Sequence, residues 1–375
     1  MRDSKVLGGL SPYDPKYIPA KVLLSANESP ADVPAEVKLA CLERIQKTAF
    51  NRYPQPTADA LRDLIAGKLY ELVLPTLDDA VRDGLNLPAV SRDQIVVGNG
   101  GDELLFNLMM AFGGPGNSVL VVPPAFSVYA IDAHMTGTEV VEVPMRADFA
   151  IDEDAVVERA SQDDVNMVVI TSPNNPTGGL ASPAFVERLL QSTQALVLLD
   201  EAYGEFAEKT SIPLVAKYPN LCVLRTFSKA YSLAGVRLGY VVSSKEVADR
   251  LLMVRQPYSV DSISQVVGEE VTRRCHLYKP LVRGTIARRA TVLERLRCIS
   301  GVEAFDSSAN FVMARVKGAA AVWESMVNDG GVLVRNFDGH AYLEGCLRIT
   351  IGTDEENQCM LDALAAGVVD GFARG

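Results

Sequence analysis

A lysine at position 229 stands among small hydroxyl residues directly after an apolar run. The surrounding sequence is Thr226-Phe-Ser-Lys229, and a second cation, Arg237, follows eight residues later. The preceding run Leu221-Cys-Val-Leu224 is typical of a buried strand. Because burial lowers the pKa of an ammonium group, a lysine at such a place is expected to be neutral or chemically used. One use that fits is a Schiff base with an aldehyde cofactor, whose phosphate the hydroxyls and the arginine would hold.

Two further polar residues follow the apolar run Leu196-Val-Leu-Leu199. Asp200 ends this run, and residues at the carboxyl ends of strands in an open α/β sheet face the ligand crevice. A carboxylate there can pair with a protonated pyridine nitrogen, although an N-cap of the next helix explains the residue equally well. The hydroxyl of Tyr203 would reach the same place; the alternative is an ordinary partly buried tyrosine.

Loops after three other apolar runs supply the next candidates. The rigid turn Ser172-Pro-Asn-Asn-Pro-Thr-Gly-Gly179 would present the Asn175 amide to a ring oxygen, and its composition is more specific than a plain turn requires. Gly98-Asn-Gly-Gly-Asp-Glu103 precedes a helix, so its backbone N–H groups would form an anion cradle, although a helix start alone also accounts for it. Phe126 either stacks on a flat cofactor or belongs to the core.

The elements that must position these residues alternate along the chain. Short apolar runs lie at residues 94–97, 118–122, 140–143, 167–170, 196–199, 221–224 and 240–242, with helical segments between most of them. This alternation predicts an α/β fold with a mostly parallel sheet covered by helices on both faces. A long helical stretch from about residue 244 to residue 296 follows. Strand-like runs at 310–315, 332–335 and 346–351 then indicate a smaller α/β domain.

We therefore predict an N-terminal arm at residues 1–30, a large domain at 31–250 and a small domain at 251–375. A length of 375 residues fits this two-domain division. The segment 70–91 carries prolines and acidic residues and looks like an insertion, to which the sequence assigns no role.

Composition excludes several other classes of protein. A net charge of −11 argues against a nucleic-acid binder, which needs a cationic face. No apolar stretch is long enough to cross a bilayer, and the first residues lack the apolar core of a signal peptide, so we expect a cytoplasmic location. The six cysteines and three histidines are scattered, which favours reduced thiols and gives no support to a metal site.

Taken together, these residues resemble a fold-type I pyridoxal-phosphate aminotransferase over nearly the whole chain, and among these enzymes most of all the histidinol-phosphate aminotransferases. The matching elements are Ser11-Pro-Tyr13, Ser25-Ala-Asn-Glu28, Asn51-Arg-Tyr-Pro54, Gly98–Glu103, Pro123-Pro-Ala-Phe126, Ser172–Gly178, Asp200-Glu-Ala-Tyr203, Arg225–Lys229, Leu233–Arg237, Val334-Arg335 and Cys346–Thr350. The resemblance implies a three-layer large domain of the aspartate-aminotransferase type with a smaller C-terminal domain.

The resemblance also implies roles for individual residues. Lys229 would bond to the aldehyde of pyridoxal 5'-phosphate, Asp200 would pair with its ring nitrogen, and Tyr203 and Asn175 would bind its phenolic oxygen. Phe126 would stack on the ring in place of the tyrosine usual at that position. The residues expected at the cofactor phosphate are Gly101, Asp102, Thr226, Ser228 and Arg237. Tyr53 would reach the cofactor phosphate of a neighbouring subunit, which implies a homodimer with shared sites.

Substrate recognition is expected from two arginines and a tyrosine. By resemblance, Arg348 would hold the α-carboxylate of glutamate, and Arg335 its second carboxylate or a substrate phosphate, over which Tyr13 would close. A surface salt bridge is the ordinary alternative for either arginine. The predicted activity is transfer of the amino group of histidinol phosphate to 2-oxoglutarate.

Other readings of the same scaffold remain open. An aromatic amino-acid aminotransferase and a threonine-phosphate decarboxylase share these motifs, and the element Ala26-Asn-Glu28 favours an aminotransferase over the decarboxylase. A non-catalytic regulatory descendant is the alternative from a different class. That alternative would not need all five of the site residues Lys229, Asp200, Tyr203, Asn175 and Arg237.

Overall fold

The larger of two sheets is built from the predicted apolar runs. The computed structural model describes residue 8 and residues 18–374, and within them the strand order of this sheet is β2-β8-β7-β6-β5-β3-β4. The strands are β2 (Ile95–Gly98), β3 (Ser118–Val121), β4 (Glu139–Glu142), β5 (Val165–Thr171), β6 (Leu196–Asp200), β7 (Leu221–Thr226) and β8 (Gly239–Ser243). Neighbours pair in parallel except at β8, which runs antiparallel to β2 and β7. The mostly parallel sheet predicted from the sequence is confirmed.

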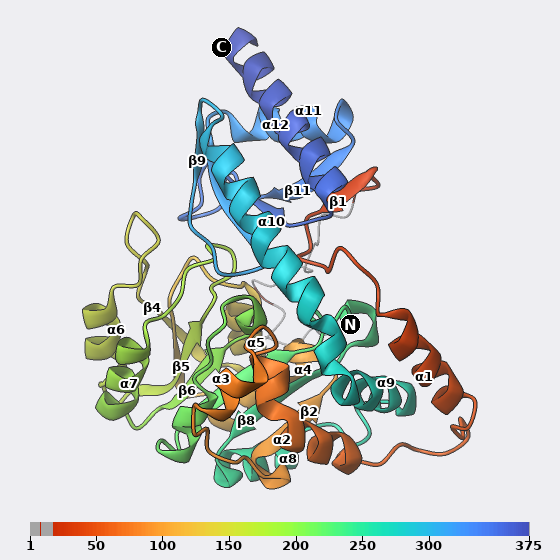
Figure 1. The fold of residues 1–375 in the computed structure, drawn as a ribbon. Coiled ribbons are helices and arrows are strands. Elements are labelled where there is room, and N and C mark those ends of the chain that lie inside the picture. The colour runs from red at the N-terminus through yellow and green to blue at the C-terminus, as the bar shows by residue number, and fades with distance from the viewer. Residues whose placement is uncertain (1–7, 9–17, 375) are drawn as a thin grey trace, which may run out of the picture.

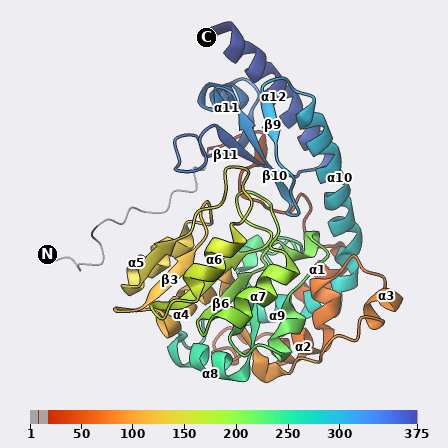
Figure 2. The same ribbon diagram turned by 90° about the vertical axis from the view of Figure 1, so that its left-hand side faces the viewer.

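Helices cover both faces of this sheet, as Figures 1 and 2 show. They are α1 (Ala35–Ile45), α2 (Asp59–Val73), α4 (Gly100–Phe112), α5 (Val128–Thr136), α6 (Glu153–Ala160), α7 (Pro183–Ser192), α8 (Lys245–Val254) and α9 (Ser262–Arg273). Successive side chains of a strand point to opposite faces. Accordingly, Val197 and Leu199 of β6 belong to one hydrophobic core, whereas Leu196 and Leu198 belong to another. The large unit therefore has the expected three layers.

The smaller sheet takes one strand from the start of the chain. Its order within the described residues is β1-β11-β12-β10-β9, with β1 (Val22–Leu24), β9 (Val302–Ala304), β10 (Phe311–Val316), β11 (Val332–Asn336) and β12 (Cys346–Thr350). The last three were predicted, whereas β1 and β9 were not. β1 pairs in parallel with β11, and α11 (Ala319–Asn328) and α12 (Asp354–Arg374) pack with this sheet. The boundaries at residues 30 and 250 stay a prediction.

The helical stretch that follows β8 is not continuous. It consists of α8, α9 and α10 (Lys279–Arg297), with a break between residues 255 and 261. Asp261 begins α9, because its Oδ1 accepts hydrogen bonds from the backbone N–H groups of Ile263 and Ser264 at 2.8 and 2.9 Å. The long helix α10 then runs from the larger unit to the smaller one (Figure 1).

The insertion at residues 70–91 is closed by one hydrogen bond between its ends and is tied to α10 near its middle. It contains the end of α2 and the short α3 (Asp79–Asp83). The Tyr70 hydroxyl donates to the Pro88 carbonyl at 2.9 Å, and Asp78 pairs with Lys279 and Arg283 of α10 at 2.8 and 3.2 Å. The segment therefore packs its residue Asp78 against the N-terminal turns of α10. Among the helices that the structure describes, none has the length and apolar character needed to span a membrane.

Candidate active site

A cavity of about 420 Å³ lies where the carboxyl ends of β6 and β7 face the smaller sheet. Twelve of the residues singled out from the sequence line it: Gly101, Asp102, Phe126, Asn175, Asp200, Tyr203, Thr226, Ser228, Lys229, Arg237, Arg335 and Arg348. Residues at the carboxyl ends of parallel strands share one edge of the sheet, which explains why distant motifs meet here. Tyr53 does not line the cavity, and Tyr13 lies outside the described residues.

The Lys229 amine has the electrostatic setting of a reactive lysine. Its Nζ donates a hydrogen bond to the carbonyl oxygen of Ala26 at 3.1 Å and lies 5.9 Å from the centre of the Tyr203 ring. Burial, reinforced by the nearby charge of Arg348, lowers the pKa of Lys229 to about 8. About one in ten of these amines is therefore neutral at pH 7, far more than for an ordinary lysine, and a neutral amine is what a nucleophile or a general base requires.

Asp200 is a buried carboxylate held by two donors. Tyr129 donates its hydroxyl to Oδ2 at 2.6 Å, and the backbone N–H of Ala202 donates to Oδ1 at 2.9 Å. The Tyr129 oxygen also lies 2.8 Å from the Thr171 hydroxyl, which must donate because the Tyr129 hydrogen is already used. Burial raises the pKa of Asp200. A cationic ring nitrogen beside it would restore the charged form. No α-helix begins at Asp200, so it is not the N-cap considered as an alternative.

A cation, two hydroxyls and the start of α4 converge at one end of the cavity. Arg237 contacts Asp102 at 3.0 Å, and the Thr226 hydroxyl donates to that of Ser228 at 3.0 Å. Gly100 has a φ of +79°, and a Cβ atom there would lie 2.5 Å from Nη2 of Arg237. Only glycine therefore allows the guanidinium to reach the N-terminus of α4. Backbone N–H groups, hydroxyls and a guanidinium together suit a phosphate group.

Two arginines from the smaller sheet also line the cavity. Arg335 of β11 and Arg348 of β12 are direct cross-strand partners. Arg348 is 8% exposed; it donates to Oδ1 of Asn175 at 2.5 Å and to the Ser25 carbonyl at 2.6 Å. Its guanidinium carbon also lies 5.4 Å and 5.6 Å from the centres of the Phe311 and Phe337 rings. A guanidinium fixed in this way is preorganised to bind a carboxylate, and it leaves the Asn175 N–H₂ group to serve another acceptor.

The family follows from a comparison with known protein families. The model of the aminotransferases of class I and II matches residues 19–364. The chain belongs to this family. Aminotransferases of this family depend on pyridoxal phosphate, so the aminotransferase activity and the cofactor expected from the sequence are confirmed.

Individual relatives resemble this aminotransferase over almost their full length. The histidinol-phosphate aminotransferase of Thermococcus gammatolerans is 37% identical over 96% of each chain. That of Chlorobaculum tepidum is 34% identical over 92% of this chain and 94% of its own. Among solved structures, the histidinol-phosphate aminotransferase of Sinorhizobium meliloti, in complex with pyridoxal-5'-phosphate, covers 98% of each chain with a TM-score of 0.85 and 24% identity. The last comparison supports the aspartate-aminotransferase-like fold predicted from the sequence.

The residues of the aminotransferase site include some to which the sequence analysis gave no role. Tyr129 holds Asp200, Thr171 supports Tyr129, and Asn27 donates to the Tyr203 hydroxyl oxygen at 3.0 Å. For Tyr129, the sequence signal was its position three residues after Phe126, which indicates that the two rings lie close together. The two rings meet edge to face, with their centres 5.9 Å apart.

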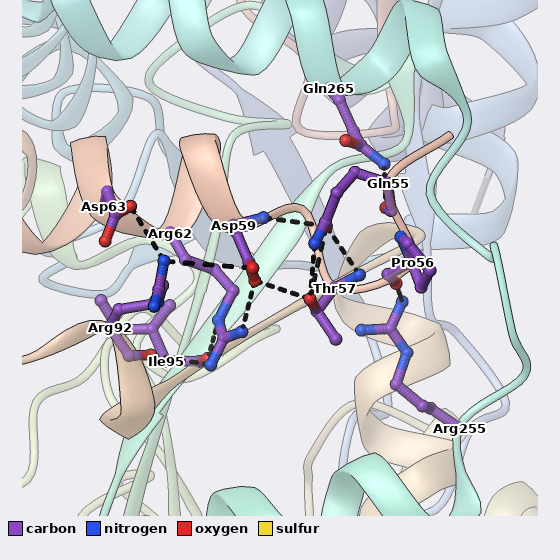
Figure 3. Close-up of polar contacts among 10 residues, drawn as sticks. All are labelled: Gln55, Pro56, Thr57, Asp59, Arg62, Asp63, Arg92, Ile95, Arg255 and Gln265. Carbon is purple, nitrogen blue, oxygen red and sulfur yellow. Dashed lines mark hydrogen bonds and ion pairs between the residues drawn. The ribbon is translucent and has the colours of Figure 1, made fainter. Parts of the chain in front are cut away.

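Tyr53 lies on the surface and outside the cavity of its own chain. It is 80% exposed, and its ring stacks on that of Tyr258 with the centres 4.5 Å apart. The next residues are rigidly held: Arg255 donates to the Pro56 carbonyl and Gln265 to the Gln55 carbonyl, both at 2.9 Å (Figure 3). The fold thus presents this ring outward on a fixed loop, and its role toward a second subunit stays a prediction.

Proposed function

We propose that this aminotransferase transfers the amino group of histidinol phosphate to 2-oxoglutarate, giving imidazole-acetol phosphate and glutamate in histidine biosynthesis. The observation that carries this proposal is the cross-strand pair of Arg335 and Arg348 beside Lys229. Both substrates are anionic while the chain has a net charge of −11, so local cations are needed to attract them. The relatives named histidinol-phosphate aminotransferase support the first of these two substrates.

The cavity residues fit pyridoxal phosphate. Thr226, Ser228, Arg237 and the N–H groups at Gly101 and Asp102 would hold its phosphate, and Asp200 its ring nitrogen. Tyr203 and Asn175 would bind the phenolic oxygen, with Phe126 against the ring. When bound, the cofactor supplies an aldehyde that condenses with amines and a ring that accepts electron density from the substrate α-carbon.

The protein's own groups move and position protons. The Lys229 amine, with its pKa lowered to about 8, would take the proton from the substrate α-carbon as a general base and deliver it to the carbon that came from the cofactor aldehyde. Asp200 keeps a proton on the ring nitrogen. Arg348 binds the α-carboxylate of the glutamate and 2-oxoglutarate pair, which histidinol phosphate lacks. Arg335 receives either the second carboxylate of that pair or the phosphate of histidinol phosphate, so one site serves two substrates in turn.

One experiment separates the candidate substrates. We expect the pyridoxal-phosphate-loaded protein to convert histidinol phosphate with 2-oxoglutarate as acceptor, with glutamate measured as product. Phenylalanine and threonine phosphate are the comparison substrates. Absence of turnover with histidinol phosphate would refute the proposed substrate and leave the family unaffected, while release of carbon dioxide from threonine phosphate would identify a decarboxylase.

An aromatic amino-acid aminotransferase is the second candidate, because a pocket of about 380 Å³ adjoins the site. Phe126, Phe337 and Leu343 give it an apolar lining, while Arg335 and Arg348 face it from the shared side. An aromatic side chain fits such a lining. Preferential turnover of phenylalanine over histidinol phosphate would favour this candidate.

The assembly and location are further parts of the proposal. A homodimer with Tyr53 at the neighbouring site is supported by the large apolar side chains exposed nearby on α1 and the following loop, namely Leu39, Leu42 and Phe50. Sedimentation of the purified protein as a monomer would refute the dimer. Cell fractionation that recovers the protein outside the cytoplasm would refute the cytoplasmic location.

A further inference from the structure

Asn27 lines the cavity and touches three separate parts of the chain. It is 1% exposed. Its backbone N–H donates to the Thr350 hydroxyl at 3.0 Å, and its carbonyl accepts from the Asn310 side chain at 3.0 Å. Its own Nδ2 donates to the Tyr203 hydroxyl oxygen at 3.0 Å. The smaller sheet thus anchors a side chain that reaches a tyrosine of the larger unit.

Thr350 determines which way the Asn27 amide points. Its hydroxyl oxygen accepts the Asn27 backbone N–H, and its single hydrogen is donated to Oδ1 of the same residue at 3.1 Å. With the amide oxygen held there, the N–H₂ group faces Tyr203. This orientation satisfies the hydroxyl of Thr350 both as acceptor and as donor.

We propose that Asn27 is a positioning residue that directs the hydroxyl hydrogen of Tyr203 toward the phenolic oxygen of the bound cofactor. An amide N–H₂ group can only donate, so the Tyr203 oxygen accepts from it and the Tyr203 hydrogen must go to a different acceptor. The inference rests on the proposed placement of Tyr203 against that oxygen. Tyr203 lines the cavity, and its ring centre lies 5.9 Å from the Lys229 amine, so its hydroxyl is available to a ring bonded to that amine.

The cofactor's visible absorbance reports this hydrogen bond. A hydrogen bond donated to the phenolic oxygen stabilises negative charge there, and so favours loss of the proton shared between that oxygen and the Lys229 nitrogen. Removing the donor raises the pH at which the proton leaves. A residue that merely ties the chain to the smaller sheet would change stability without moving this optical midpoint.

The test is a pH titration of the visible band in the cofactor-loaded full chain. We expect Asn27→Ala to raise the midpoint by about 0.5 to 1 pH unit, the equivalent of one hydrogen bond. Tyr203→Phe should raise it at least as much, and Asn27→Ala should add nothing in the Tyr203→Phe background. Asn27→Asp, which reverses the hydrogen bond and adds negative charge, should raise it further and serves if the alanine variant does not fold. Ser29→Ala, in the same segment but bonded to Ser232, is the matched control and should leave the midpoint unchanged.

Two outcomes would overturn the inference. One is a midpoint in Asn27→Ala equal to that of the wild type; the other is full additivity with Tyr203→Phe. Borohydride reduction of the wild type, followed by peptide mapping, tests the underlying placement separately. If Lys229 is not labelled, the proposed site itself fails; if it is labelled and the midpoint does not move, only the role of Asn27 fails.

Discussion

Replacing Tyr129 by phenylalanine removes one oxygen and tests how Asp200 is kept charged. The ring keeps its edge-to-face contact with Phe126, but Asp200 loses the donor at 2.6 Å and retains only the Ala202 N–H at 2.9 Å. A hydrogen bond to a buried charge contributes about 1.5–3 kcal/mol. We therefore expect the apoprotein to lose roughly that much stability at a pH where Asp200 is ionised.

The pH dependence gives the sharper test. Burial already raises the pKa of Asp200 in the folded state, so its ionised form opposes folding and this cost appears as the pH rises through the raised pKa. The variant raises that pKa further. Its stability deficit should therefore be largest at higher pH and should shrink, to about 1 kcal/mol for a neutral hydrogen bond, as the pH falls and Asp200 is protonated in both proteins.

Urea unfolding of the two apoproteins over a series of pH values measures this difference. Because the proteins differ by one hydroxyl group, the titration of all other groups cancels in the difference between their free energies of unfolding. Replacement of Tyr218 by phenylalanine, which removes a hydroxyl bonded to the partly exposed Glu187, serves as the control and should cost less than about 1 kcal/mol. A deficit in Tyr129→Phe that is the same at every pH would refute the reasoning.

Three further predictions concern other parts of the molecule. Lys229→Ala should lower turnover by at least about 10³-fold, because it removes both the bond to the cofactor and the general base. Lys245→Ala, on the exposed surface of α8, is the control. Near-normal turnover of the Lys229→Ala variant would exclude the role of Lys229. Arg348→Lys keeps the charge but loses the fixed planar contact, so KM for the 2-oxo acid should rise about tenfold in steady-state kinetics, whereas an unchanged KM would place the carboxylate elsewhere. Arg225→Met leaves Glu201 and Glu205, which pair with it at 2.5 and 3.1 Å, buried without a cation, and should cost about 3–5 kcal/mol in urea unfolding. Burial raises the pKa of Glu205 to about 7, so this cost should grow as the pH rises through 7; a cost independent of pH would contradict it.

The sequence predicted the large sheet well because local signals define it. All of its strands except the edge strand β4 are short, largely apolar runs bounded by turn residues, and strands that are buried on both faces produce such runs. β1 was missed because it has three residues, of which only Val22 and Leu24 are buried. Its partner β11 lies more than three hundred residues away, and no local pattern announces such a pairing.

The break in the helical stretch after β8 was visible in the sequence and was overlooked. Pro257 cannot continue a helix, and Asp261 is a favoured N-cap residue. The supporting residues of the site are a different case. The hydrogen bonds of Tyr129 and Asn27 join elements far apart in the chain. The spacing of residues along the sequence therefore does not predict them.

The site depends on the smaller sheet for orientation more than for chemistry. The reactive groups stand at strand ends of the larger sheet, yet the segment 25–27 contacts three of the residues that surround the reaction. The carbonyl of Ser25 accepts from Arg348, and that of Ala26 accepts from Lys229. The side-chain amide of Asn27 donates to the Tyr203 hydroxyl oxygen. This segment directly follows β1, whose pairing with β11 sets its register. Placement of the smaller sheet therefore determines together where the Arg348 guanidinium, the Lys229 amine and the Tyr203 hydroxyl lie.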